Sequence, residues 1–207
     1  MAVRQETTNE ITLRGSTEIV TEFFGYSINS ILYQRGIYPP ETFERAQKYG
    51  ISLFVSSDDG LNKYLQQVLS QLSQWLLHGE VEKLVVVIMG AQSQSTLERW
   101  VFNIDTDKQM TVNMPGKQKP QKEIMNEIQA LIRQITSTVS FLPLINEPCT
   151  FDLLIYADSQ ADVPSSWEES DPKYITNSTE VRLRSFTTKV HKVETTVTYK
   201  DHPSEEL

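Results

Sequence analysis

The chain has 207 residues, 39% of them hydrophobic and 22% charged, which suits one soluble domain with a single apolar core over residues 1–207. A formal net charge of −8 argues against nucleic acid as the main partner, because binding phosphates needs clustered Lys and Arg. The single cysteine, Cys149, excludes an internal disulfide, and the longest apolar run, residues 84–89, is far too short to cross a membrane.

The first predicted helix covers residues 16–32. It follows a polar N-terminus, residues 1–10, which we expect to be flexible and which contains no apolar secretory signal. Ser16 is the expected N-cap, with Glu18 as the favourable acidic residue of the first turn. Apolar side chains recur at intervals of three and four and predict one buried stripe: Ile19, Val20, Phe23, Phe24, Ile28, Ile31 and Leu32.

Two more segments have helical periodicity. The second predicted helix starts at Asp58, an N-cap candidate, and ends before Gly79, a residue type that often follows the last turn. The third covers residues 122–138, and Arg133 lies on its polar face. Its opposite face is predicted to be buried and consists of Ile124, Ile128, Leu131, Ile132 and Ile135.

Strand-like segments lie between and after these helices. Residues 82–89 contain a near-continuous apolar run, which is typical of a central strand. Four more segments are predicted to be strands because their side chains alternate between apolar and polar or form one buried face. They are residues 100–104, 151–156, 181–185 and 193–199. Helices and strands do not alternate strictly, so we predict an α+β fold with a mainly antiparallel central sheet and the helices packed on one face.

Two polar segments are predicted to be loops, residues 105–121 and residues 158–178. The second contains Pro164, Pro172 and many acidic residues, and it is long for a passive connection, so it is either functional or disordered. It also contains Trp167, which a purely solvated loop would have little reason to carry.

Catalytic motifs are missing from the sequence, which has no GxSxG, no P-loop, no HExxH and no CxxC pair. The three histidines are scattered, and no base can be assigned beside Cys149, so we expect no enzyme activity, no metal and no cofactor. The acidic residues Glu168, Glu169 and Asp171 have no histidines near them in the sequence. They form either a solvated loop or a charged lip on a binding site.

Specific strings go further than periodicity. They are GYSINSILYQRGIYP at residues 25–39, LERW at 97–100, IRQITSTVSFLP at 132–143, FDLLIY at 151–156 and a long stretch at 167–193. In this order and spacing they resemble the HORMA-domain spindle assembly checkpoint proteins of the mitotic-arrest-deficient type. The resemblance runs from about Ile11 to Tyr199, and the sequence departs from the family mainly at residues 1–10, at 106–121 and after Tyr199.

The resemblance implies a HORMA fold with three helices on one face of the sheet and a mobile C-terminal region, residues 158–207. It also implies a switch between an open state, in which the C-terminal strands cover one sheet edge, and a closed state, in which they lie at the opposite edge. A partner peptide then pairs with the exposed strand, which corresponds to Phe151, Asp152, Leu153, Leu154, Ile155 and Tyr156. A belt of residues 158–178 crosses the peptide and contains Trp167, Glu168, Glu169 and Ser170.

The resemblance further implies that the protein inhibits the anaphase-promoting complex and so delays anaphase. The implied partners are the activator subunit of that complex, a coiled-coil kinetochore checkpoint adaptor, a kinase or pseudokinase of the mitotic checkpoint complex, and a HORMA-type antagonist with an AAA+ remodelling ATPase. Neither nucleic acid nor membrane is an expected partner. Open and closed copies are expected to dimerise through Arg133, Gln134 and Phe141.

The implied locations are the nucleus, the kinetochore, the spindle and the cytoplasm. One alternative shares the fold and the belt but captures different peptides: a HORMA adaptor of translesion DNA repair or of meiotic axis assembly.

Overall fold

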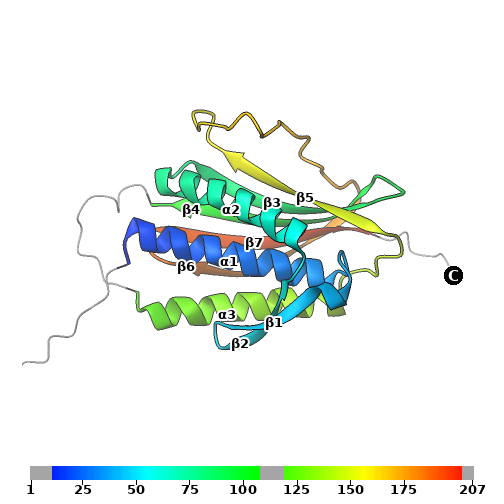
Figure 1. Cartoon of the computed structure of the whole chain (residues 1–207), viewed down its shortest axis with the longest axis horizontal. Helices are drawn as coiled ribbons and strands as arrows, with labels where there is room; N and C mark the ends of the chain where they lie inside the picture. Colours follow the sequence, from blue (N-terminus) through cyan, green and yellow to red (C-terminus); the bar gives the residue numbers. More distant parts are fainter. Residues whose placement is uncertain (1–10, 108–118, 202–207) are drawn as a thin grey trace, which may run out of the picture.

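A five-stranded antiparallel sheet with helices on one face forms the centre of the computed structural model, which describes residues 11–107 and 119–201 (Figure 1). The strand order is β5-β3-β4-β7-β6, and each neighbouring pair is antiparallel. The strands are β3 (Val81–Gly90), β4 (Thr96–Thr106), β5 (Cys149–Ala157), β6 (Ser178–Thr187) and β7 (His191–Lys200). The predicted α+β fold and the five predicted strands are confirmed, with β5 at one edge and the β6–β7 hairpin at the other.

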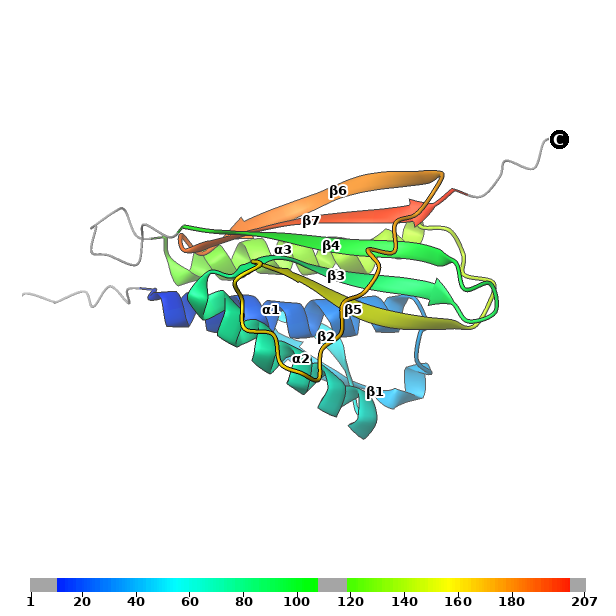
Figure 2. The same cartoon turned by 90° about the horizontal axis from the view of Figure 1, so that it is seen from above.

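The helices α1 (Leu13–Gln34), α2 (Asp59–His78) and α3 (Gln121–Ser137) cover the same face of the sheet (Figure 2). The predicted limits of α2 are confirmed: the Asp58 carboxylate accepts the Leu61 N–H at 2.7 Å, and Gly79 ends the helix with φ 67°. The predicted limits of α3 are correct to within one residue. A short 3₁₀ turn, η3 (Thr138–Ser140), follows it.

The predicted start of α1 is wrong. Its N-cap is Thr12, whose side chain accepts the Gly15 N–H, so the helix begins at Leu13 and no acidic residue lies in its first turn. The Ser16 hydroxyl could not serve as the cap because it is buried and makes tertiary contacts with Thr188 and His191. A tertiary contact therefore overrides the local signal.

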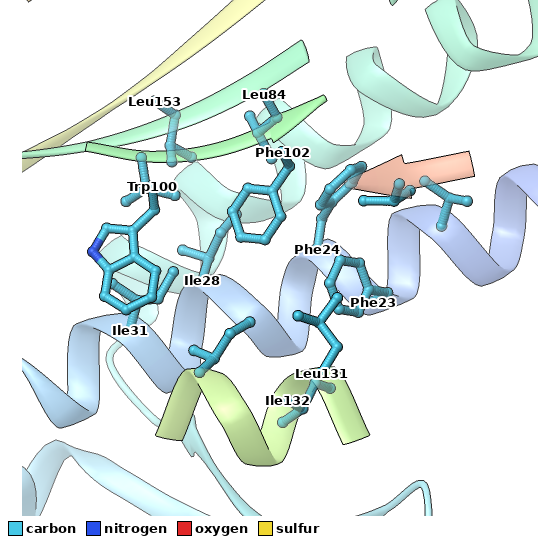
Figure 3. Packing of buried hydrophobic residues seen from close by; sticks show 14 of the residues in the cluster. Phe23, Phe24, Ile28, Ile31, Leu84, Trp100, Phe102, Leu131, Ile132 and Leu153 are labelled. Carbon is cyan, nitrogen blue, oxygen red and sulfur yellow. The ribbon is translucent and has the colours of Figure 1, made fainter. Parts of the chain in front are cut away.

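The core lies between the helices and the inner face of the sheet. Phe23 and Phe24 of α1 both meet Phe102 of β4, with ring centroids 5.9 Å and 5.5 Å apart (Figure 3). Leu131 and Ile132 of α3 are also fully buried here. Full burial of each such side chain contributes about 1.5–3 kcal/mol, so this cluster is the main source of stability.

A second, two-stranded sheet escaped the sequence prediction. Strands β1 (Phe43–Lys48) and β2 (Ile51–Ser56) follow a short 3₁₀ turn, η1 (Pro40–Thr42), and form an antiparallel hairpin. The hairpin turn is made by Tyr49 and Gly50, both with positive φ, as a tight two-residue turn requires. Strand β1 is mostly polar and exposed, so its sequence carries little of the alternation that reveals a strand.

Loop boundaries differ from the predictions at their ends. Of the predicted loop 105–121, the first two residues belong to β4 and the last begins α3, because both elements extend further than their apolar patterns. Of the predicted belt, Ser178 already belongs to β6. The flexibility expected for residues 1–10 concerns a segment outside the described residues, as do residues 108–118 and 202–207.

Candidate peptide-binding edge and belt

Strand β5 has a free edge. Among the described strands it pairs with β3 alone, so its other side has no strand beside it. The Ala91 N–H donates to the Pro148 carbonyl at 2.8 Å, and the alternation that follows makes Leu153 and Val86 a pair that exchanges no hydrogen bonds. The N–H and C=O groups of Phe151, Leu153 and Ile155 therefore point to the free edge. An edge of this kind is a template for an added strand.

Apolar side chains flank this edge on both faces of the sheet. On the helix side, the Phe151 ring meets Tyr38 and Tyr64 edge to face, with centroids 6.2 Å and 5.9 Å away. On the outer face, Leu154 and Tyr156 pack with the strand-β3 valines Val85 and Val87. A peptide strand added here would meet aromatic rings with one set of alternate side chains, and Asp152, Leu154 and Tyr156 with the other.

The belt, residues 158–177, is anchored to α2 on the helix side of the sheet. Trp75 of α2 is almost completely buried, and its Nε1–H donates to the Asp162 carbonyl of the belt at 3.0 Å. The Trp167 ring packs edge to face on Trp75, with centroids 5.1 Å apart. Trp167 therefore packs as the sequence suggested, on a partner that sequence reasoning missed.

A second belt contact lies on the opposite face of the sheet. The Tyr174 ring stacks on the guanidinium of Arg99, 4.7 Å from its central carbon. Arg99 lies opposite Val87 in the ladder and therefore projects from the outer face. Between the two anchors, Glu168, Glu169 and Ser170 are exposed, and the belt passes in front of the free edge of β5 before joining β6 (Figure 2).

The belt and the sheet together form a ring around the edge of β5. The ring is closed only because β7 pairs with β4, from Glu98↔Tyr199 to Thr106↔His191. A hydrogen-bonded cluster fixes the turn of this hairpin to α1: the Ser16 hydroxyl lies 2.5 Å from the Thr188 hydroxyl and 2.6 Å from Nδ1 of His191. Burial lowers the pKa of His191 to about 4, while a contact with the Leu76 backbone opposes this shift, so the imidazole is neutral at pH 7.

A buried ion pair fixes the chain before β5. Nη2 of Arg35 lies 2.5 Å from the Glu98 carboxylate and also donates to the Pro143 carbonyl at 2.6 Å. The Trp100 Nε1–H donates to the same carboxylate at 3.1 Å. Burial raises the pKa of Glu98, and the nearby Arg35 opposes the rise. Sequence reasoning missed this cluster because residues 35, 98 and 143 are far apart in the chain.

The predicted dimerisation residues lie on α3 and just after it. Arg133 is exposed, and Phe141 is 46% exposed beside the exposed Val139. Gln134 is half-buried, and its side-chain oxygen accepts the Arg184 N–H of β6 at 2.7 Å. The role of these three residues in dimerisation stays a prediction.

No described helix is long and apolar enough to cross a membrane. The described residues contain no group of three or more His, Cys, Asp and Glu side chains that could hold a metal ion.

A family model for the HORMA domain matches residues 16–191, so the chain belongs to the HORMA family. The mitotic spindle assembly checkpoint protein MAD2A of Dictyostelium discoideum is 60% identical, over 92% of this chain and 93% of its own length. MAD2A of Homo sapiens is 56% identical, over 97% and 98%. Within the HORMA family, the chain thus groups with the mitotic spindle checkpoint proteins of the MAD2 type.

The fold agrees with this grouping. A chain in the crystal structure of the mitotic checkpoint complex matches with a TM-score of 0.82 and 42% identity, covering 90% of this chain and 99% of that one. The checkpoint interpretation is therefore preferred to the translesion or meiotic alternative.

Proposed function

We propose that this protein is a spindle assembly checkpoint adaptor that entraps a partner peptide on β5 and thereby inhibits the anaphase-promoting complex. Its place among the MAD2-type checkpoint proteins supports the cellular role. The single observation that carries the mechanism is the belt, which runs from Trp75 on the helix side to Arg99 on the outer face and encloses the free edge.

The chemistry is binding without catalysis. A peptide that pairs with β5 gains backbone hydrogen bonds worth about 0.5–1.5 kcal/mol each, which alone give modest affinity. Enclosure acts mainly on release. A peptide that lies between two larger folded domains of its own chain cannot slide out lengthwise, so it cannot leave until the ring opens. The expected signature is a slow off-rate with a normal on-rate for the competent state.

A conformational switch supplies the opening step in this proposal. In the described state β7 pairs with β4 and leaves β5 free, which is the arrangement expected of a closed form. In the open form the C-terminal strands would pair with β5 and cover the site. Side chains alternate along much of β7, so one edge can serve as well as the other, as a two-state element requires.

The partners in this proposal are those of a checkpoint adaptor. They are the activator subunit of the anaphase-promoting complex, a coiled-coil kinetochore adaptor, a checkpoint kinase or pseudokinase, and a HORMA-type antagonist with an AAA+ ATPase. The protein also dimerises with itself, and it works at kinetochores and the spindle as well as in the nucleus and cytoplasm.

A pull-down from mitotic extract tests the proposal. Wild-type protein should recover the activator subunit of the anaphase-promoting complex, whereas recovery of a translesion polymerase subunit in its place would contradict the checkpoint role. The variant Ile155→Pro removes an N–H that points to the free edge and should lose the activator, since proline is tolerated only where that group is unpaired. Ile155→Val keeps the N–H and serves as the matched control.

A further inference from the structure

We propose that Asp152 is an intramolecular cap on the free edge of β5, and that it competes with any strand that pairs there. The Asp152 carboxylate accepts the N–H of Leu153 at 2.8 Å. That N–H is the central donor of the free edge, because Leu153 exchanges no hydrogen bonds with Val86 of β3. The carboxylate thus occupies the position that the carbonyl of an added strand would take.

The surroundings of Asp152 give its carboxylate no other strong partner. It lies opposite Val87 on the outer face, and none of the ion pairs among the described residues includes it. Burial raises the pKa of Tyr64 to about 12, the Asp152 charge adds to the rise, and contact with the Leu153 backbone opposes it.

A charged side chain at an exposed edge is a known protection against unwanted pairing between strands. Here the protection has a functional cost, because the cap must open before a strand can bind. A single hydrogen bond of ordinary net strength lowers the fraction of molecules whose edge is uncapped, and so able to pair with a strand, by about three- to tenfold. The cap thus stabilises the empty state in which the hairpin lies on β4.

The consequence for the switch rests on the proposed function. If the C-terminal strands cover β5 in the open form, they displace the cap, so losing Asp152 leaves the open form unchanged. Asp152→Ala should then destabilise only the empty closed form. The peptide-free population should shift toward the open form by about three- to tenfold.

The first experiment tests the cap without using a ligand. Asn103 and Glu194 are partners in the β4–β7 ladder, so Asn103→Cys with Glu194→Cys, in a Cys149→Ser background, should form a disulfide that holds the hairpin on β4. Amide hydrogen exchange of Leu153 is then measured by NMR in the oxidised protein. Asp152→Ala should exchange about three- to tenfold faster, and Asp152→Asn, which keeps an acceptor oxygen, should lie between it and the parent. An unchanged rate in Asp152→Ala, or an equal rate in Asp152→Asn and Asp152→Ala, overturns the cap.

The second experiment tests the competition. Without the disulfide, the two hairpin positions in the peptide-free protein are counted from their separate NMR signals. A shift toward the β5-paired form in Asp152→Ala supports the competition, and unchanged populations overturn it. If the wild-type protein shows no β5-paired form, the proposed switch is contradicted. The exchange rates of the first experiment then still decide whether Asp152 caps the edge.

Discussion

Trp167 is the residue at which entrapment and simple edge binding predict different results. Its ring packs on Trp75 and holds the belt against α2. Trp167→Ala should speed release of a bound activator peptide by about thirtyfold, the equivalent of the roughly 2 kcal/mol carried by an aromatic anchor, with little change in the capture rate. Stopped-flow release measures this, and Trp167→Phe, which keeps a ring, is the matched control. A lowered melting temperature of the free protein with an unchanged release rate would make Trp167 a core residue only.

His191 makes stability depend on pH. Its pKa of about 4 in the folded protein lies below the ordinary value of 6.5, so the unfolded chain binds more protons between these limits. The free energy of unfolding should therefore fall as the pH drops through this window, by up to about 3 kcal/mol from this residue. Denaturant unfolding of wild type and His191→Asn across the window checks it. Curves that stay parallel would contradict the assignment.

For individual residues, the sequence predicted single features better than the contacts between residues. The position of an aromatic residue in a polar segment indicated that Trp167 packs. Nothing local indicated that its partner is Trp75, which lies in α2 with the core residues Leu72 and Leu76. Ser16 was predicted as a helix cap from its local sequence alone. Its actual partners, Thr188 and His191, are distant in the chain and leave no local signal. Caps can be predicted from neighbours, whereas tertiary hydrogen bonds cannot.

At the scale of elements, α3 carries the predicted dimer surface, and the structure changes how that surface is tested. Gln134 holds the Arg184 N–H of β6, so its replacement disturbs the hairpin as well as any interface. Arg133→Glu alone should abolish dimerisation at a wild-type melting temperature, because reversing an exposed charge adds repulsion at the contact. Sedimentation velocity decides the matter. A wild-type dimer fraction would remove Arg133 from the interface.

Helix and strand predictions succeeded where burial imposes a period. The helical periodicity of α1, α2 and α3 was readable because one face of each helix enters the core, and the apolar run of β3 was readable because both of its faces are buried. The β1–β2 hairpin was missed because β1 is mostly exposed and the partner that buries β2, α1, is not adjacent in sequence. The 3₁₀ turns were missed because their few residues carry no period.

At the scale of the whole molecule, the closed ring depends on the last strand. Thr198, Tyr199 and Lys200 pair with β6, and the first two also pair with β4. Deleting residues 198–207 should trap the open form and weaken binding of an activator peptide at least about tenfold, because it removes contacts that only the hairpin on β4 makes. Deleting 202–207 keeps all of β7 and is the control. Wild-type affinity in a titration of the longer truncation would refute the role of β7.

Strand order could not be read from patterns within the chain. Nothing in the alternation of β6 and β7 selects the β4 edge over the β5 edge, because either edge offers the same backbone groups. The edge strand and the belt were placed by resemblance, and the structure then showed how they lie around one another. Enclosure is a property of connectivity and has no local signal.

Locking the ring with a disulfide tests directly whether the peptide is entrapped. The Asn103→Cys and Glu194→Cys disulfide fixes β7 on β4, and an activator peptide is fused between two folded domains so that it cannot slide out lengthwise. Dissociation is followed after oxidation of the complex, and capture is followed after oxidation of the empty protein. Entrapment predicts that neither process occurs until a reductant is added. Free exchange of the peptide through the oxidised protein would contradict entrapment.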